Sequence, residues 1–196
     1  MKRLRKLMMM LGVLTLMTSF FTSCNYNALT EKEQKVEQSW AQVQNVYQRR
    51  ADLISNLVSV VKGYAAHESQ TLEAVVNARA KATQINVDAS KLDEEQIKKF
   101  QEAQGELSSA LGRLMAVTEA YPDLKANENF LSLQSQLEGT ENRIAVERKR
   151  YTEAVMDYNT SIKKFPTVIY ASWFGFEEKP QFQADESAQK APEVKF

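Results

Sequence analysis

The sequence has one cysteine and one histidine in 196 residues, Cys24 and His67. A disulfide needs two cysteines, and a zinc site of cysteine and histidine needs three or four such ligands, so neither can form within one chain. His67 is followed by Glu68, but Thr71 occupies the position at which a zinc-protease helix carries its second histidine. The sequence therefore predicts no metal site.

Glycine and proline are scarce, with six and four residues. Gly63 and Gly175 are isolated, so the glycine-rich loop that would hold the phosphates of a nucleotide is missing. The combination of 43% hydrophobic and 26% charged residues with so few helix breakers is typical of a helical globular domain. The sequence therefore indicates long helices and predicts no cofactor.

The longest apolar run, residues 7–21, is shorter than the roughly 20 residues that span a bilayer. Four basic residues precede it, which are Lys2, Arg3, Arg5 and Lys6. It ends in Phe-Thr-Ser-Cys at residues 21–24, which resembles a lipobox, where signal peptidase cuts before the cysteine and the thiol is acylated. We expect residues 1–24 to be a lipoprotein signal peptide ending at a lipidated, palmitate-bearing Cys24. The alternatives are a short uncleaved anchor, or ordinary cleavage that leaves a free thiol.

The residue after Cys24 bears on the membrane that holds the protein. Asn25 stands there instead of the aspartate associated with inner-membrane retention in enteric bacteria. We therefore expect a cell-envelope protein that faces the periplasm, with the outer membrane favoured over the inner one. Without its first 24 residues the chain has 21 basic and 25 acidic side chains. A mildly acidic domain argues against a nucleic-acid partner.

A seven-residue repeat of large apolar side chains runs through residues 127–166. Its members are Phe130, Leu137, Ile144, Tyr151, Tyr158 and Phe165. Such a repeat is typical of a long helix that packs against other helices. Four residues after each repeat member the side chain is polar at Gln134, Glu141 and Arg148, and apolar at Val155 and Ile162. The middle of this helix therefore needs a polar partner.

A second repeat of the same period follows Tyr26. It comprises Leu29, Val36, Val43, Leu57 and Tyr64, with Arg50 in the remaining position. Trp40, Tyr47, Ile54 and Val61 take the companion positions, so the repeat predicts a first long helix over residues 29–66. Its apolar stripe is interrupted once, by arginine.

Two shorter helices are expected between the long ones. The first covers residues 68–82, with Leu72, Val75, Val76 and Arg79 setting its phase. After a loop at residues 85–91, Asp93 and Gln96 form a capping box for the next helix, whose inward side chains are Ile97, Phe100, Leu107, Leu111, Leu114 and Thr118. Gly105 and Gly112 would lie where a neighbouring backbone comes close, and Asn127 would cap the last helix.

These patterns together predict an all-α fold, an antiparallel up-and-down bundle of four helices over residues 25–183. The first and last helices are long, with heptad-like, coiled-coil cores. Residues 168–176 are apolar and aromatic, and we expect them to fold over one end of the bundle. Residues 184–196 are polar and predicted to be a disordered tail.

Several segments occur together in a characteristic order. They are QRRADLISNLV at residues 48–58, VKGY at 61–64, EAYPDLKAN at 119–127, and the later residues Tyr151, Tyr158-Asn159 and Phe165-Pro166. In this combination the chain resembles the LemA family of bacterial membrane-associated proteins over residues 26–182. The resemblance implies a bundle of four long helices and brings no established enzymatic activity. Ser55 replaces a proline usual in the family, so a straighter first helix is expected, and Cys24 ends a segment that in the family is an uncleaved transmembrane helix.

The antiparallel arrangement assigns a partner to the arginine in the first repeat. Residue 66 ends the first helix level with residue 127, which begins the last. Arg50 lies 16 residues before the first point and Glu141 lies 14 residues after the second, a slip of about 3 Å. We expect Arg50 and Glu141 to pair, with Arg148 and Asn56 as secondary members of a structural polar clamp. The alternative is that these polar positions form a recognition surface.

Heptad helices on a lipid tether suit a non-enzymatic scaffold that contacts other envelope proteins. We therefore expect a protein partner, of unspecified identity, besides the membrane. One alternative is an unrecognised envelope enzyme, built on His67 with Glu68 or on Glu119 near Tyr121. Adjacent residues of a helix point about 100° apart, so His67 and Glu68 do not converge. The other alternative is a carrier of an apolar ligand between helices, supported only by Met115 and Met156.

Overall fold

The computed structural model describes residues 2–85, 87–89 and 92–183. Its elements are α1 (Lys2–Tyr64), α2 (Ser69–Gln84), α3 (Glu94–Thr118), the short α4 (Pro122–Lys125), α5 (Glu128–Lys163), the short α6 (Thr167–Tyr170) and the 3-10 helix η2 (Ser172–Phe174). No strand occurs in these ranges, so the all-α prediction is confirmed. The predicted tail, residues 184–196, lies outside the described residues.

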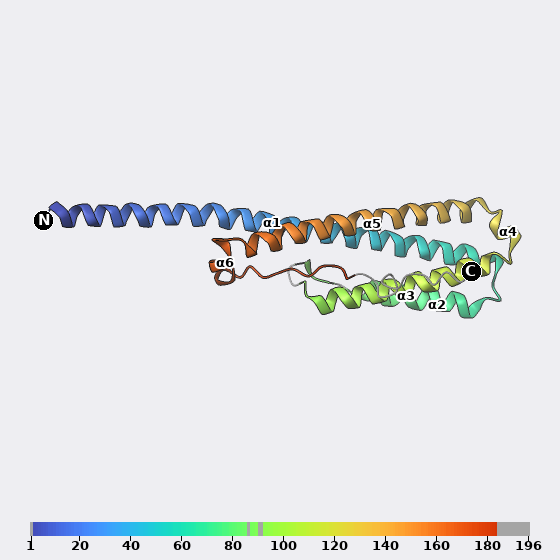
Figure 1. Cartoon of the computed structure of the whole chain (residues 1–196). Helices are drawn as coiled ribbons and strands as arrows, with labels where there is room; N and C mark the ends of the chain where they lie inside the picture. Colours follow the sequence, from blue (N-terminus) through green and yellow to red (C-terminus); the bar gives the residue numbers. More distant parts are fainter. Residues whose placement is uncertain (1, 86, 90–91, 184–196) are drawn as a thin grey trace, which may run out of the picture.

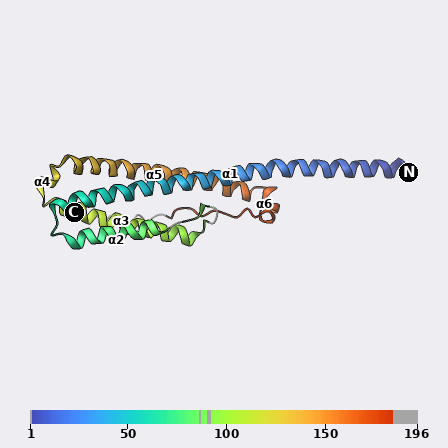
Figure 2. The same cartoon turned by 180° about the vertical axis from the view of Figure 1, so that it is seen from behind.

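The helices pack as two antiparallel pairs. α1 lies side by side with α5, and α2 lies side by side with α3, in both views of the molecule (Figures 1 and 2). The pairs meet chiefly where α2 packs on α1. The N-terminal part of α1 projects beyond the other helices, so α1 is both one side of the packed body and a long extension from it (Figure 1).

Two helix starts are fixed by side-chain caps at the predicted residues. Asp93 Oδ1 accepts a hydrogen bond from the backbone N–H of Gln96 at 2.7 Å, which begins α3. The reciprocal half of the predicted capping box is not formed, because Gln96 Oε1 has no partner among the described residues. Asn127 Oδ1 accepts a hydrogen bond from the N–H of Phe130 at 3.0 Å, which begins α5. Each cap satisfies an N–H that has no partner within its own helix, which is why the helices begin there.

The core consists of two hydrophobic clusters, one after the other along the bundle. The first cluster is aromatic and contains Trp40, Tyr47, Phe100, Tyr151 and Tyr158 together with aliphatic residues of α1 and α5. The second is aliphatic, and its larger members are Ile54, Leu57, Leu107, Leu114, Leu124, Phe130 and Leu137. All members of the two seven-residue repeats except Tyr64, which is 44% exposed at the C-terminal end of α1, and Phe165 are buried, so the repeats identified the packing faces of both long helices.

Several sequence-based expectations about the helices differ from the structure. α1 begins at Lys2 instead of residue 29, because residues 2–28 contain no proline to end the helix. Phe165 is 80% exposed, since α5 ends at Lys163 and the extended backbone of Lys164 takes the chain out of the helical phase. Val76 is 51% exposed because it lies beside Val75, which takes the inward position of α2. Finally, Gly105 and Gly112 are exposed and approach no neighbouring backbone.

The apolar run at residues 7–21 forms part of α1. Among the described residues, no helix is both long and apolar enough to cross a membrane. α1 passes without interruption through Ser55.

The chain after α5 turns back along the bundle. α6 and η2 lie at the end from which α1 projects, and the following segment runs back between the two helix pairs (Figure 1). We call residues 177–183 the C-terminal strap. The ring of Tyr26 in α1 lies 5.5 Å from that of Phe174 and 5.3 Å from that of Phe176, so the expected fold-back over one end is present.

Candidate functional site

A buried arginine joins three helices in the middle of the bundle. Arg50 of α1 is 3% exposed. Its Nε lies 2.7 Å from Glu141 Oε1 of α5, and its Nη2 donates a hydrogen bond of 2.6 Å to Ser108 Oγ of α3. The structure thus brings together Arg50 and Glu141, the two residues predicted to pair, and adds Ser108 as a third.

The two charges of this pair lie in different surroundings. The side chain of Glu141 is 48% exposed, so of the two residues of the expected clamp only Arg50 is buried. Within the described chain, the Nε–H of Arg50 makes no hydrogen bond, because it does not point at the carboxylate despite the 2.7 Å separation. The contact is therefore an ion pair without a directed hydrogen bond at Nε.

The two secondary members of the expected clamp separate. Arg148 stacks its guanidinium over the ring of Phe182 in the strap, with 4.5 Å from Cζ to the ring centroid. It also lies close enough to Tyr47 to oppose the rise in the pKa of that hydroxyl, a rise caused mainly by burial. Asn56 is exposed on the surface of α1, so it is not a member of the buried clamp around Arg50.

The Arg50 contact lies at the boundary between the two core clusters. On α1, Tyr47 belongs to the aromatic cluster and Leu53 to the aliphatic one. On α5 the boundary falls between Leu137 and Ile144, a stretch that includes Glu141 and buried Thr140. On α3 it falls after Phe100, next to buried Gln104. We call Arg50, Gln104, Ser108, Thr140 and Glu141 the polar layer.

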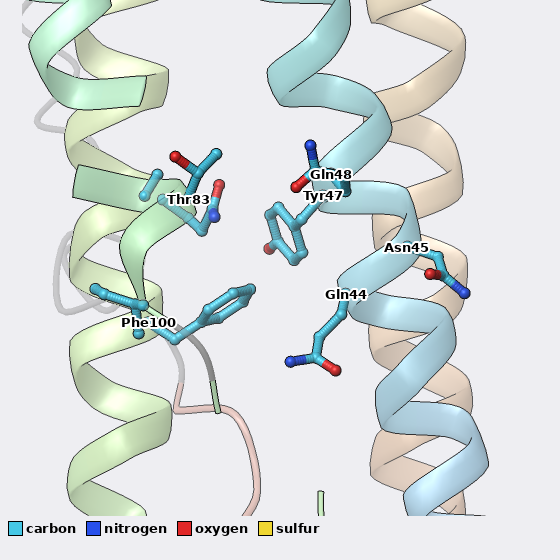
Figure 3. A pocket seen from close by; sticks show the side chains of 9 residues that line it. Gln44, Asn45, Tyr47, Gln48, Thr83 and Phe100 are labelled. Atoms are coloured by element: carbon cyan, nitrogen blue, oxygen red, sulfur yellow. The ribbon is translucent and has the colours of Figure 1, made fainter. Parts of the chain in front are cut away.

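A cavity of about 370 Å³ opens between α1 and the α2–α3 pair beside this layer. Its lining residues are Gln44, Asn45, Tyr47, Gln48, Ala82, Thr83, Ile85, Phe100 and Gln104, and none of these is charged. The rings of Tyr47 and Phe100 point toward one another and are in edge-to-face contact on the wall of the cavity, with 5.0 Å between centroids and nearly perpendicular planes (Figure 3). The cavity therefore combines aromatic walls with neutral amide and hydroxyl groups.

Gln104 gives this cavity a directional feature. It is 7% exposed, and its Oε1 has no hydrogen-bond partner within the described residues. An acceptor left in this state costs about 1–3 kcal/mol. Because Oε1 itself has almost no accessible surface, the Gln104 amide must turn toward the cavity to meet a bound N–H or O–H group. The sequence carried a signal for it, because Gln104 lies four residues after Phe100 and three before Leu107 on the inward stripe of α3.

Side-chain amides hold the C-terminal strap in an extended conformation. Asn159 of α5 donates to the carbonyl of Lys179 at 2.8 Å and accepts from its N–H at 2.9 Å. Gln101 of α3 makes the same pair of bonds with Gln183, at 2.9 and 3.1 Å. The hydroxyl of Tyr151 donates to the carbonyl of Pro180 at 2.8 Å. The strap therefore ties α5 to α3, a role that nothing in the sequence pattern indicated.

The groups considered for catalysis do not assemble. His67 is exposed in the turn between α1 and α2. Glu68 accepts a hydrogen bond of 3.1 Å from the hydroxyl of Tyr121, which raises the tyrosine pKa, while Glu119 pairs with Lys125 at 2.6 Å. In the part of the chain that the structure describes, no three histidine, cysteine, aspartate or glutamate residues are grouped to hold a metal ion. Of the expected lipidation site, Cys24, the structure describes the backbone, as part of α1.

The fold, the positions of the repeats and the motifs quoted above agree with a comparison to known families. A model described as the LemA family matches residues 39–196. The chain belongs to the LemA family. Its curated relatives include Magnetosome protein MamQ 2 of Paramagnetospirillum magneticum, 27% identical over 90% of this chain and 71% of the relative. Magnetosome protein MamQ of Magnetospirillum gryphiswaldense is 26% identical over 90% of this chain and 72% of the relative, and Protein LemA of Metamycoplasma hominis is 24% identical over 82% and 69%.

Proposed function

We propose that this LemA-family chain is a non-enzymatic, lipid-anchored protein of the cell envelope that faces the periplasm and serves as a helical scaffold for other membrane proteins. The observation that carries the proposal is the course of α1. This helix runs unbroken from Cys24 into the packed body, and Tyr26 already packs against Phe174 and Phe176. A lipid on Cys24 would thus be attached directly to the end of a rigid bundle, with no flexible linker between them.

The rigidity of the bundle supports the scaffold role. The polar clamp of Arg50 and Glu141 fixes the register of α1 and α5, because a slip would leave the arginine buried without its carboxylate. The outer face of α5 also carries large exposed apolar side chains, at Leu131, Val146 and Met156. Their helical phases lie within one face about 80° wide, which suits contact with a partner protein.

Anchoring is tested by metabolic labelling with a fatty acid in the native host. The wild-type chain should incorporate the label, and Cys24→Ala should not, because its side chain offers no sulfur for acylation. Cys24→Ala should also remain as uncleaved precursor or be released from the membrane. An unlabelled wild-type protein would show that the lipobox interpretation is wrong.

The scaffold role is tested by site-specific crosslinking. A photoreactive residue at Val146 or Met156 should capture a defined envelope protein in intact cells, and the same residue at exposed Asn77 of α2 is the matched control. Equal capture from both faces would contradict a partner surface on α5. As a check on the non-enzymatic assignment, His67→Ala should leave any cellular phenotype intact while the protein accumulates normally.

The unpaired Oε1 of Gln104 favours a second candidate function, the binding of a small neutral ligand in the cavity beside the polar layer. Such a ligand would stack on Tyr47 or Phe100 and donate an N–H or O–H to Gln104. This differs from the alternative of an apolar carrier built on Met115 and Met156, since Met156 is 58% exposed. Ligand-observed NMR with neutral amides and alcohols should detect binding that Gln104→Met abolishes, and equal binding by the variant would exclude this site.

A further inference from the structure

Five large apolar side chains are exposed together at the end of the bundle. They are Phe165, Val168, Ile169, Trp173 and Phe174, at 80%, 53%, 54%, 80% and 54% exposure. We call this group the apolar tip. All five fall within ten consecutive residues, on and beside α6 and η2. Isolated exposed apolar residues are ordinary, but a concentration of this kind marks a surface that another apolar phase covers.

The tip is held by an ordered turn. Thr167, Tyr170, Ala171 and Phe176 of the same segment are buried and fix it to the bundle. The N–H of Phe176 donates to the carbonyl of Ala171 at 3.0 Å, and the intervening Gly175 has φ +80°, a conformation that favours glycine. The segment thus has an inward face that packs and an outward face of aromatic and aliphatic groups. The outward side chains are displayed by a defined backbone.

The tip lies where the proposed lipid anchor enters the bundle. Tyr26, whose ring packs against those of Phe174 and Phe176, is only two residues after Cys24. Two helical residues correspond to about 3 Å along the helix axis. Figure 1 shows α6 at the end of the packed body from which α1 projects. An acylated Cys24 would therefore hold the apolar tip against the membrane surface.

The charges around the tip indicate which kind of membrane contact is possible. Lys163 Nζ pairs with Glu178 at 2.8 Å, and the neighbouring charges, exposed Lys164 and exposed Glu177, are also of opposite sign. These four charges of the described segment next to the tip therefore balance and give no excess of positive charge to attract anionic headgroups. Tryptophan and phenylalanine, in contrast, are side chains suited to the interface between headgroups and acyl chains.

We propose that the apolar tip lies in the interfacial region of the lipid bilayer, through burial of its aromatic and aliphatic side chains and without a requirement for anionic lipid. This rests on the proposed anchoring at Cys24, which brings the tip to the membrane. The tip in turn gives the bundle a second point of contact. Two contacts fix the orientation of the long axis relative to the membrane, which one flexible acyl attachment would leave free.

The two tryptophans allow a direct test. Trp173 is 80% exposed in the tip, whereas Trp40 is fully buried in the core. Full-length protein purified from membranes should be reconstituted into phosphatidylcholine vesicles that contain lipids brominated on the acyl chain. Trp173 emission should shift to shorter wavelength and lose intensity relative to unbrominated vesicles, equally with and without phosphatidylglycerol. Trp173→Phe, which leaves only Trp40, should show neither the shift nor the loss.

Further variants separate the tip from other apolar residues. The combined change Phe165→Ser and Ile169→Ser should reduce the quenching of Trp173, and Val76→Ser with Leu131→Ser, away from the tip, should not. Unquenched Trp173 in a protein that carries the fatty-acid label would overturn the tip proposal while leaving the anchor intact. Quenching in an unlabelled protein would support the tip and contradict the anchor. A third outcome would be a Trp173 emission shifted to shorter wavelength without quenching by brominated lipid, in a protein that sediments as a dimer. This outcome would mean that the tip contacts a second copy of the chain, and it would overturn the proposal.

Discussion

The two partners of the Arg50–Glu141 ion pair should differ in how much their removal lowers the free energy of unfolding. The arginine is buried, whereas Glu141 and Ser108 are exposed and can bond to water when the arginine is removed. Removing the carboxylate leaves a buried charge with a single hydroxyl partner. Removing the arginine leaves no buried charge, so the two single substitutions should have unequal effects.

For Glu141→Leu we expect the free energy of unfolding to fall by about 3 kcal/mol, because Arg50 keeps its charge in the core. Arg50→Met, which keeps an unbranched apolar side chain in place of the aliphatic part of arginine, should lower it by only about 1 kcal/mol. The double variant should lose less than the two single losses together. Chemical denaturation of the four proteins measures the cycle. Additive losses would show that the two residues do not interact.

Two buried tyrosines predict alkaline destabilisation. Burial raises the pKa of Tyr151 and of Tyr158, and the nearby charge of Glu33 raises the latter further. The folded state then holds a proton that the unfolded state releases above pH ~10, so this contribution is complete below that pH and is lost as pH rises toward the folded-state pKa. The free energy of unfolding should fall by ~1.4 kcal/mol per pH unit for each tyrosine. Urea denaturation from pH 8 to 11 tests this. Tyr158→Phe should reduce the dependence of the free energy of unfolding on pH by the contribution of one tyrosine, ~1.4 kcal/mol per pH unit.

Contacts of single residues could be predicted from the sequence where helical spacing alone determines them. Arg50 and Glu141 could be paired because both interrupt apolar repeats and an antiparallel arrangement places them level. The partner of Arg148 could not be foreseen, since Phe182 reaches it only through the extended strap. Asn56 lies six residues after Arg50, a rotation that puts it on another face of α1.

Among the elements, α3 carries two glycines that its surroundings do not require. A methyl group at Gly105 or at Gly112 would meet nothing within 4 Å. Each change to alanine should raise the free energy of unfolding by about 1 kcal/mol, because alanine is the better helix former. Thermal denaturation of the single and double variants measures the gain. Gly175→Ala is the opposing control, and the left-handed conformation there should make it lose roughly 1 kcal/mol.

The strap should depend on its amide contacts. Asn159→Ala removes both hydrogen bonds to Lys179, so amides of residues 177–183 should exchange with deuterium faster than in the wild type. Exposed Asn142, also on α5, provides the control Asn142→Ala, which should leave the exchange of this segment unchanged. Mass spectrometry of peptides that cover the strap gives the measurement. Unaltered exchange in Asn159→Ala would mean that the aromatic contacts of Phe182 hold the strap without the amides.

The helices were predictable because each has periodic apolar positions and capping residues that act locally. The strap was not, since an extended segment without internal hydrogen bonds takes its conformation from distant side chains, such as Asn159 and Gln101. The start of α1 was missed for a related reason. The predicted boundary between signal peptide and mature domain, after Cys24, carries no helix-breaking residue, so α1 continues through it.

The whole molecule divides into two helix pairs that differ in how they are held. α5 packs along α1, whereas α3 packs mainly on α2 and reaches α5 through Arg50 and the strap. Arg79 of α2 strengthens the junction by donating from Nε to the carbonyl of Ala51 at 2.7 Å. The α2–α3 pair therefore has fewer attachments to α1 and α5 than those two helices have to one another.

We expect α2 and α3 to open as one unit before α1 and α5 do. Their amides should exchange with deuterium at a common rate that exceeds the rate of the buried parts of α1 and α5. Arg79→Met should accelerate exchange in α2 and α3 while leaving α5 unchanged. Native-state hydrogen exchange at low denaturant resolves the two groups. A single rate for all four helices, in both proteins, would show that the fold opens only as a whole.

The unbroken course of α1 also defines a distance. From Tyr26 to Tyr64 the helix rises by about 57 Å. If Cys24 is held at the membrane and the bundle stands upright on its apolar tip, the turn at the far end projects by that amount from the membrane surface. The exposed His67 and the short helix α4 would then lie at a fixed height above the bilayer. The length of one helix would thus determine how far from the membrane any protein bound there is positioned.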